Sequence, residues 1–250
     1  MSNAPVTLLC LPCAGASASM YLRWRRHLPS TVRLLPVELP GRGMRLNDAF
    51  VEDFSQLAAQ LGAEQRAAMQ GRYALFGHSM GALLAFALAQ QQRAGGLPLP
   101  GALFVSGSPA PQCREREILG QEDFGQEDDA ALIRALHQHG GTPPDVFASD
   151  ELLRMTLNTL RADYRVCASF SCQNVFPLPV PLQVLAGRRD TIRDASQQAW
   201  REHTRADFSL RWFDGGHFFI REQEAAVLAC LRDGLARYFP EVAHAAVAAS

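Results

Sequence analysis

Short apolar runs alternate along this chain with longer stretches in which apolar residues recur at helical spacing. Six such runs predict strands, at residues 6–11, 32–39, 73–76, 102–105, 182–186 and 208–213, and those at 6–11 and 102–105 are expected to be buried. Helices are predicted at residues 19–27, 53–70, 82–93, 127–139, 150–169, 195–203 and 222–239. Because strands and helices alternate, we expect an α/β fold with a mostly parallel sheet and helices on both of its faces.

The alternation stops between residues 106 and 179, where only helices are predicted. The second of them, at residues 150–169, is apolar on more than one side, so we expect it to pack on the core and also to cover a groove. We therefore predict a lid insertion at about residues 120–179, above the carboxyl ends of the strands. The alternative is a helical subdomain with no gating role. No linker or repeat divides the chain, so residues 1–250 are expected to form a single domain.

Composition and charge argue against several other classes of protein. A length of 250 residues suits one α/β domain with a sizeable core. The 24 basic and 25 acidic residues leave a formal net charge of −1, which argues against a nucleic-acid partner. No stretch approaches the ~20 apolar residues of a membrane span, and the N-terminus lacks the basic and apolar regions of a signal peptide. We therefore expect a cytoplasmic protein that does not enter a membrane.

Six cysteines raise the question of disulfides or a metal site. A chain of this length without a signal peptide does not need disulfides, so reduced and mostly buried thiols are expected. Cys10 and Cys13 form a C-x-x-C motif, but no second pair matches it and no helix directly follows it. We therefore expect neither a metal nor another cofactor.

The chemistry of the chain is indicated first by Gly77-His78-Ser79-Met80-Gly81, which lies between a predicted strand and a predicted helix. In a G-x-S-x-G motif of this kind the serine occupies a sharp, strained turn that lifts its hydroxyl clear of the sheet. Glycines two positions before and after it remove the Cβ atoms that would clash there. A chance glycine-rich turn is the alternative, but the strand–turn–helix setting favours Ser79 as a nucleophile.

A serine hydroxyl needs a base to remove its proton, and seven histidines could serve. His217 follows the last predicted strand in a Gly-Gly-His loop, where the glycines allow the imidazole to reach the serine. His78 adjoins Ser79, but the turn should aim its side chain elsewhere. The remaining histidines lie on predicted helices or in the tail and are expected to be solvated: His27, His137, His139, His203 and His244.

The base in turn needs an acid that orients it, and the expected chain order is Ser, then Asp or Glu, then His. Asp190 follows the strand before the last one and is preferred. Asp194 remains an alternative, although it is expected to be the N-cap of the helix that follows. Asp163 lies on the predicted lid helix, and Asp214 is too close to His217 along the chain.

Two backbone N–H groups are predicted to stabilise an oxyanion on the substrate. One belongs to Met80, directly after the nucleophile. The other is expected from the small-residue loop 12–17 after the first strand, with Ala14 preferred and Cys13 as the alternative.

Five segments of the chain carry a resemblance to a known family. They are Leu11-Pro12-Cys13-Ala14-Gly15-Ala16-Ser17, Glu38-Leu39-Pro40-Gly41-Arg42-Gly43-Met44-Arg45, Phe76-Gly77-His78-Ser79-Met80-Gly81-Ala82, Leu160-Arg161-Ala162-Asp163-Tyr164 and Gly215-Gly216-His217-Phe218-Phe219. In this order, and across nearly the whole chain, they resemble the type II (external, editing) thioesterases of nonribosomal peptide and polyketide synthetases. These enzymes belong to the α/β-hydrolase superfamily.

The resemblance implies hydrolysis of aberrant or stalled acyl groups from the phosphopantetheine arm of acyl or peptidyl carrier proteins, as in siderophore or antibiotic biosynthesis. It implies a monomer without a cofactor of its own, whose partner is a carrier protein. By the same resemblance Ser79, Asp190 and His217 match the family's catalytic triad, and Met80 and Ala14 match its oxyanion donors. The chain departs from the family at Ala16, where a second glycine is usual, and at Cys13, where an aromatic residue or histidine is frequent.

Three other functions compete with thioester hydrolysis on a carrier protein. A general carboxylesterase or lipase would use the same triad on small free esters. A carrier-protein binding module would hydrolyse only incidentally, although binding alone needs no activated serine. Transfer of the acyl group to an alcohol or amine is the third, because the sequence does not reveal how far water is excluded.

Overall fold

The centre of the computed structural model is a six-stranded sheet with the strand order β2-β1-β3-β4-β5-β6. Every neighbouring pair of strands is parallel. The strands are β1 (Val6–Leu11), β2 (Val32–Pro36), β3 (Tyr73–His78), β4 (Ala102–Ser106), β5 (Leu182–Gly187) and β6 (Phe208–Phe213). The structure describes residues 5–114, 128–139, 142–172, 176–240 and 242. The four inner strands are buried along their whole length, as predicted for β1 and β4.

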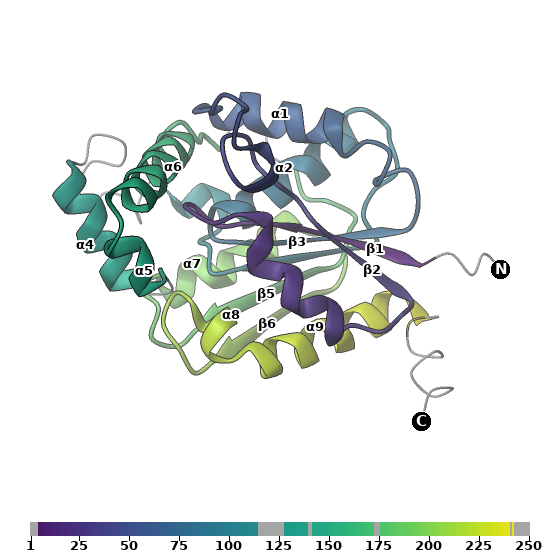
Figure 1. Ribbon diagram of the computed structural model, residues 1–250. Helices are drawn as coiled ribbons and strands as arrows, with labels where there is room; N and C mark the ends of the chain where they lie inside the picture. Colours follow the sequence, from purple (N-terminus) through teal and green to yellow (C-terminus); the bar gives the residue numbers. More distant parts are fainter. Residues whose placement is uncertain (1–4, 115–127, 140–141, 173–175, 241, 243–250) are drawn as a thin grey trace.

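Helices cover both faces of this sheet (Figure 1). On one face α1 (Phe54–Glu64) and α2 (Met80–Ala94) pack against the strand residues that include Leu9, Leu75 and Val105. On the other face the 3₁₀ helix η1 (Ala18–Arg26) and α9 (Glu224–Tyr238) pack against the alternate strand residues, such as Leu8 and Phe76. Side chains along a strand point to opposite faces in turn, so each inner strand supplies both halves of the core.

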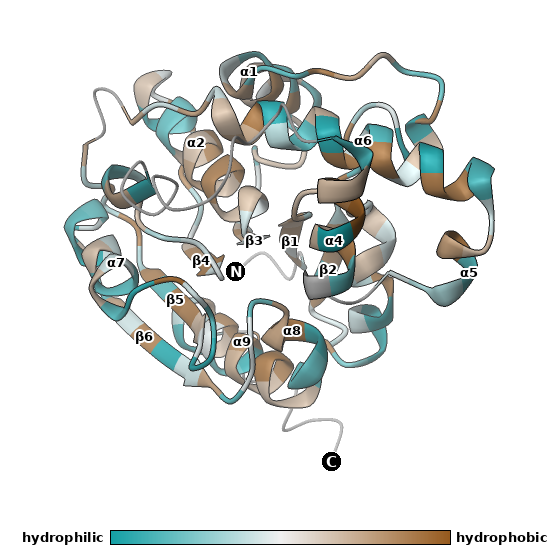
Figure 2. Ribbon diagram, turned by 90° about the vertical axis from the view of Figure 1, so that its left-hand side faces the viewer, coloured by the Kyte–Doolittle hydropathy of each residue, from teal (hydrophilic) through white to brown (hydrophobic). Residues whose placement is uncertain are grey.

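The helical insertion lies at the carboxyl end of the strands, where α4 (Asp129–His139), α5 (Pro144–Phe147) and α6 (Asp150–Ala168) gather (Figures 1 and 2). The carboxyl-terminal half of α6 is buried and contributes Val166 and Cys167 to the main core. Its amino-terminal half exposes Leu152 and Met155. One end of the helix is therefore part of the core, whereas the other end lies at the surface.

The predicted strands are all present, and the differences concern their ends. β1 and β6 have the predicted bounds, whereas β2 stops at Pro36, which has no N–H to donate to a neighbouring strand. Several helices differ more. The 53–70 helix ends at Glu64, and the 19–27 segment winds as a 3₁₀ helix.

One predicted helix is divided in two: residues 195–203 form α7 (Asp194–Gln198) followed by the 3₁₀ helix η4 (Ala199–His203). The helix predicted at 222–239 is α9, and the short helix α8 (Phe219–Glu222), which was not predicted, precedes it. Between α4 and α6 lies the short helix α5, which was not predicted and which begins with a proline at its first position.

Some predictions fall outside the described residues. These are the first part of the insertion at 120–127, the Gly140-Gly141 pair and most of the tail after Pro240. None of the helices in the described part of the chain combines the length and apolar character needed to cross a bilayer. The six cysteines, all of which lie in the described ranges, form no disulfide; Cys10, Cys13 and Cys167 are buried and the other three are partly exposed.

Candidate active site

Ser79 forms the turn between β3 and α2, with φ 55° and ψ −118°. Among the described residues it is the only one other than glycine with a positive φ. Such a conformation costs about 1–3 kcal/mol and persists only where the surrounding structure enforces it. Here the Ser79 N–H donates to the Ser106 carbonyl over 2.7 Å, which ties the turn to the neighbouring strand β4. The strained turn predicted from the motif is present.

The glycines on either side of the turn are needed for close approach. A Cβ on Gly77 would lie 2.0 Å from the Gly81 carbonyl oxygen. A Cβ on Gly81 would lie 2.2 Å from the carbonyl oxygen of Leu11, at the end of β1. Both separations are far below van der Waals contact, so neither site accepts a side chain without displacing backbone. The two glycines thus allow α2 to start directly behind the strands, as expected.

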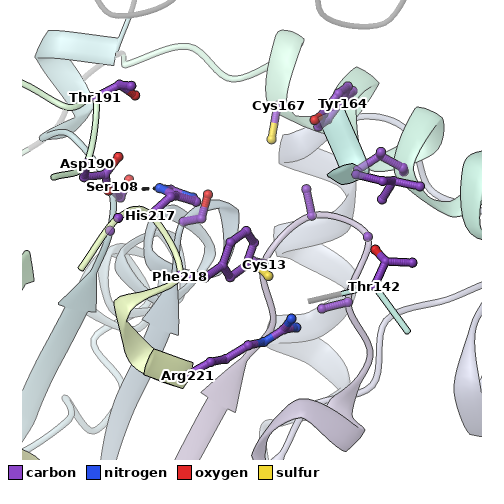
Figure 3. Close-up of a pocket in the computed structure, with 18 of the residues that line it drawn as sticks. Cys13, Ser108, Thr142, Tyr164, Cys167, Asp190, Thr191, His217, Phe218 and Arg221 are labelled. Carbon is purple, nitrogen blue, oxygen red and sulfur yellow. Dashed lines mark hydrogen bonds and ion pairs between the residues drawn. The ribbon is translucent and has the colours of Figure 1, made fainter. Parts of the chain in front are cut away.

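His217 and Asp190 come from two loops that the backbone joins. Asp190 follows β5, His217 follows β6, and the Arg189 N–H donates to the Gly215 carbonyl over 2.9 Å. Nδ1 of His217 lies 3.0 Å from Oδ2 of Asp190, whose side chain is 2% exposed (Figure 3). Ser79 lines the same cavity as these two residues. The structure therefore brings together the serine, histidine and aspartate that the sequence singled out.

The other aspartates lie elsewhere. Asp194 is exposed, does not line this cavity, and is the first residue of α7 rather than its N-cap. The N-cap is Arg193, so the predicted cap was wrong by one residue, and a first-turn carboxylate acts on the helix dipole instead. Asp214 is exposed and pairs with Arg189. Asp163 is buried on α6, where it pairs with Arg42.

His78 is buried beneath the candidate base. Its Nδ1 lies 3.0 Å from the Ser106 hydroxyl, and its ring centroid is 5.1 Å from that of His217. Burial lowers the pKa of His78 well below its ordinary value, and the neighbouring His217 and Arg221 lower it further. A neutral ring therefore supports His217 from below. The ring of His78 also lies near those of Phe218 and Phe219, with centroids 5.6 and 5.9 Å away.

The prediction that His203 is solvated was wrong. This residue is 6% exposed and makes edge contacts with the rings of Phe86 and Trp200. Burial lowers its pKa to about 4. The 3₁₀ turn of η4 buries His203 together with Trp200, beside Phe86 of α2, which a helical pattern alone does not reveal.

Of the predicted oxyanion donors, Ala14 and Cys13 line the same cavity, and Met80 directly follows Ser79, which also lines it. Met80 is the first residue of α2, and an N–H at that position has no acceptor within its own helix. In the loop after β1, Gly15 donates its N–H to Asp163, and Ala16 donates to the Cys13 carbonyl. This leaves the N–H groups of Ala14 and Cys13, the two candidates weighed from the sequence. Both residues line the cavity.

The cavity has a volume of about 550 Å³ and two kinds of wall. Its floor is made by the loops after the strands. Its roof comes from the insertion and includes Leu136, Val146, Thr156, Leu160 and Tyr164. In Figure 3, Tyr164 and Cys167 face the cavity from α6, opposite His217. Three positive groups that were not selected from the sequence, Arg114, Arg189 and Arg221, also line it. The only sequence signal that could have pointed to these arginines is their position shortly after a strand.

A parallel sheet with a strained serine at a strand–helix turn, a histidine–aspartate pair beside it and a helical roof defines the class of α/β-fold serine hydrolases. The comparisons with known proteins give the family. The family described as "Thioesterase domain" matches residues 6–234, and the chain belongs to this family.

Individual relatives agree with this assignment. The chain is 37% identical to "Thioesterase PikA5" of Streptomyces venezuelae over 88% of this chain and 78% of the relative. Among solved structures it is similar to RedJ, a thioesterase from the prodiginine pathway of Streptomyces coelicolor, with a TM-score of 0.84 and 34% identity over 91% and 89% of the two chains. It is also similar to the type II thioesterase BorB from the borrelidin biosynthetic cluster, with a TM-score of 0.79 and 35% identity over 94% and 96%. The resemblance to type II thioesterases and the predicted α/β-hydrolase fold are thereby confirmed, and the protein is a thioesterase.

Proposed function

We propose that this thioesterase hydrolyses aberrant or stalled acyl groups from the phosphopantetheine arm of carrier proteins in a nonribosomal peptide or polyketide synthetase. One observation carries the proposal: a strained Ser79 shares a cavity with the His217–Asp190 pair, beneath a roof of mostly apolar side chains. The relatives described as thioesterases of biosynthetic clusters support the choice of pathway.

In the proposed mechanism Oγ of Ser79 attacks the carbonyl carbon of the thioester while His217 removes the hydroxyl proton. The Asp190 carboxylate accepts from Nδ1 of His217, which directs Nε2 to the serine and stabilises the imidazolium. The N–H of Met80 and that of Ala14 or Cys13 bind the oxyanion.

The C–S bond then breaks, the imidazolium returns its proton to the pantetheine sulfur, and an acyl-Ser79 ester remains. Water, activated by His217, hydrolyses this ester and restores the free serine. His217 passes the first proton from Ser79 to the pantetheine sulfur and the second from water back to Ser79. The mechanism therefore needs neither a metal nor another cofactor. We propose a cytoplasmic monomer whose partner is the carrier protein.

A matched pair of substrates tests the proposal. The same acyl group is presented as a thioester on a holo-carrier protein and as a small oxoester, and kcat/KM is measured for both with Ser79→Ala as the blank. Preference for the carrier-bound thioester supports the proposal. Equal or better turnover of the small ester would identify a general carboxylesterase. Tight carrier binding with no release above the blank would identify a binding module.

A further inference from the structure

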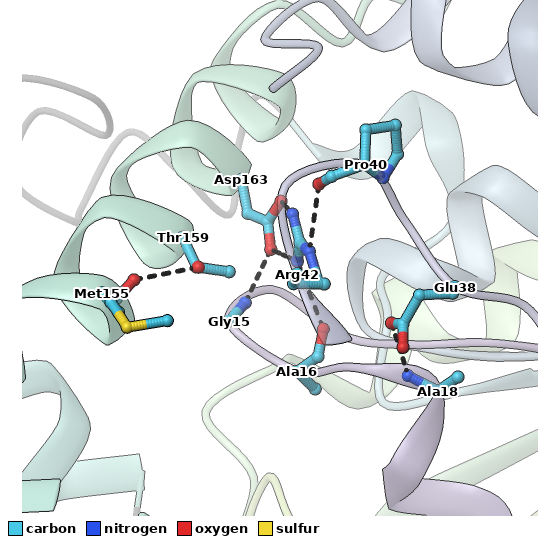
Figure 4. A network of polar contacts seen from close by, with 9 residues as sticks. All are labelled: Gly15, Ala16, Ala18, Glu38, Pro40, Arg42, Met155, Thr159 and Asp163. Atoms are coloured by element: carbon cyan, nitrogen blue, oxygen red, sulfur yellow. Dashed lines mark hydrogen bonds and ion pairs between the residues drawn. The ribbon is translucent and has the colours of Figure 1, made fainter. Parts of the chain in front are cut away.

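A buried carboxylate of the insertion reaches into the loop after β1. Asp163 lies on α6 and is 1% exposed. Its Oδ2 accepts the N–H of Gly15 over 2.7 Å (Figure 4). The Gly15 N–H comes one residue after Ala14, a candidate oxyanion donor. A residue that the sequence analysis set aside as part of a lid helix therefore contacts the loop that carries a proposed catalytic donor.

Arg42, from the turn after β2, completes this contact. Its guanidinium donates to both carboxylate oxygens of Asp163, over 2.5 and 2.7 Å, and also to the Ala16 carbonyl over 3.2 Å. The Arg42 side chain is 7% exposed. Three segments distant in sequence thus meet at one ion pair, and the Gly15–Ala16 unit is held at both its N–H and its carbonyl.

Holding the Gly15–Ala16 unit in place restricts the orientation of the neighbouring Ala14 N–H, a candidate oxyanion donor. A peptide bond is planar, so holding the Gly15 N–H also fixes the Ala14 carbonyl. Only the two backbone dihedrals of Ala14 then separate that plane from the Ala14 N–H. Gly15 itself has φ +75°, and a Cβ added to it would lie 3.1 Å from Cδ1 of Leu160, on α6. The loop is therefore clamped between α6 and the β2 turn.

A buried ion pair is a weak source of net stability, because taking both charges out of water opposes their attraction. An exposed pair on the same helix offers a contrast: Arg165 and Glu52 are 45% and 43% exposed and touch no cavity residue through this bond. The buried pair differs because each partner also binds the backbone of the 13–16 loop. Its geometry suits a role in orienting that loop.

We propose that Asp163 and Arg42 are positioning residues, which hold the 13–16 loop so that its N–H donor points at the oxyanion formed on attack by Ser79. The inference rests on the proposed function, since it presumes that an oxyanion forms there. It makes one end of α6 a part of the catalytic apparatus. In this proposal the other residues of the cavity roof contact the substrate.

The test measures the transition state separately from binding. Asp163→Ala is assayed with an acyl-pantetheine thioester, with rates expressed per active site titrated by a serine-directed phosphonate, well below the unfolding temperature. Removing an oxyanion donor lowers kcat by about 10²–10³-fold, so misplacing one is expected to lower kcat by on the order of 10- to 100-fold. KM should change by less than about threefold, because such a donor acts mainly in the transition state.

Two inhibitors sharpen the readout. A trifluoromethyl ketone analogue, which forms an oxyanion with Ser79, should lose affinity by the same factor as kcat. A thioether analogue, which cannot form one, should bind as it does to the wild type. Arg165→Gln is the matched control on α6 and should leave all four quantities unchanged.

A second variant separates positioning from stability. Arg42→Met combined with Asp163→Leu replaces the pair by apolar side chains, which commonly preserves stability, yet removes the bonds to Gly15 and Ala16. In this double variant kcat should remain as low as in Asp163→Ala, although its unfolding temperature should be close to that of the wild type. If kcat per titrated site stays within twofold of wild type in this double variant, or both inhibitors weaken equally, the inference is overturned. Absence of phosphonate labelling at Ser79 in the wild type would instead overturn the proposed function.

Discussion

The carboxyl end of the sheet and the helical insertion build one cavity but are held in different ways. Ser79, Asp190 and His217 follow strands, and backbone hydrogen bonds such as Ser79 N–H to Ser106 fix their turns. The insertion contributes side chains from helices, and its outer part exposes Leu152 and Met155. Backbone hydrogen bonds inside a buried sheet resist opening far more than the exposed end of a helix does.

The border between the two regions runs through α6. Its carboxyl-terminal half contributes Val166 and Cys167 to the main core and carries the buried Asp163. Its amino-terminal half packs with α4 in a small cluster around Leu132 and Leu157, which also includes Leu160 and Tyr164, and α5 packs against α6. We therefore expect the reaction chemistry to depend on the strand-end turns and on the inner half of α6, and the acyl group to be accommodated by the outer insertion. The lid stays a prediction, which the hydrogen exchange described below tests.

The largest expected effect comes from the orienting acid in the sheet region. Asp190→Asn should lower kcat by on the order of 10⁴-fold, because an amide favours the wrong tautomer of His217. The measurement is steady-state hydrolysis of an acyl-pantetheine thioester. Asp194→Ala is the control: it changes an exposed first-turn carboxylate and should leave kcat near the wild-type value. Comparable losses in the two variants would mean that Asp190 is not the orienting acid.

A methyl group added in the turn that follows Ser79 should destabilise the packing of α2 against the end of β1. Gly81→Ala puts a Cβ about where the Leu11 carbonyl lies, so overpacking of roughly 1–3 kcal/mol or more is expected. At about 2–4 °C per kcal/mol for a domain of this size, thermal unfolding should detect the change. Gly71→Ala is the matched control, since a Cβ there meets nothing within 4 Å. Equal unfolding temperatures for the two variants would contradict the close approach.

Hydrogen exchange tests the comparison between regions directly. Amides of α4, α5 and the first half of α6 should exchange faster than those of β4 and β5, because their cluster is smaller and more exposed. The second half of α6 should resemble the strands. Binding of a non-hydrolysable acyl-pantetheine analogue should slow exchange in the outer insertion. Uniform protection that the analogue does not alter would leave a rigid helical subdomain as the better description.

The smallest effect is expected at His203, which ends η4 and does not line the cavity. Its pKa is about 4 in the folded state against an ordinary 6.5, so the unfolded state takes up a proton first as the pH falls. The contribution to stability is present above pH 6.5 and is lost between 6.5 and 4, at no more than ~1.4 kcal/mol per pH unit. Urea unfolding at pH 7.0 and 5.5 should show a shallower loss for His203→Gln. Parallel losses would show that His203 is not buried as a neutral ring.

The parts that the sequence predicted well are those with strong local signals. Short apolar-rich runs located the strands, and two glycines around a serine located the turn, because both patterns are local to a few residues. The Arg42–Asp163 pair was missed, since its partners are 121 positions apart and meet only through the tertiary fold. His203 was misjudged for the same reason: packing by Phe86 from α2 decides its burial.

Covalent labelling tests the central claim, that the strained serine of the sheet region is the nucleophile of this thioesterase. The protein is treated with a serine-directed phosphonate, and the site is identified by peptide mass spectrometry alongside residual thioester hydrolysis. We expect one adduct, on Ser79, whose extent matches the loss of turnover, and we expect Ser79→Ala to be inactive and unlabelled. Labelling at another residue, or full activity of Ser79→Ala, would contradict the account.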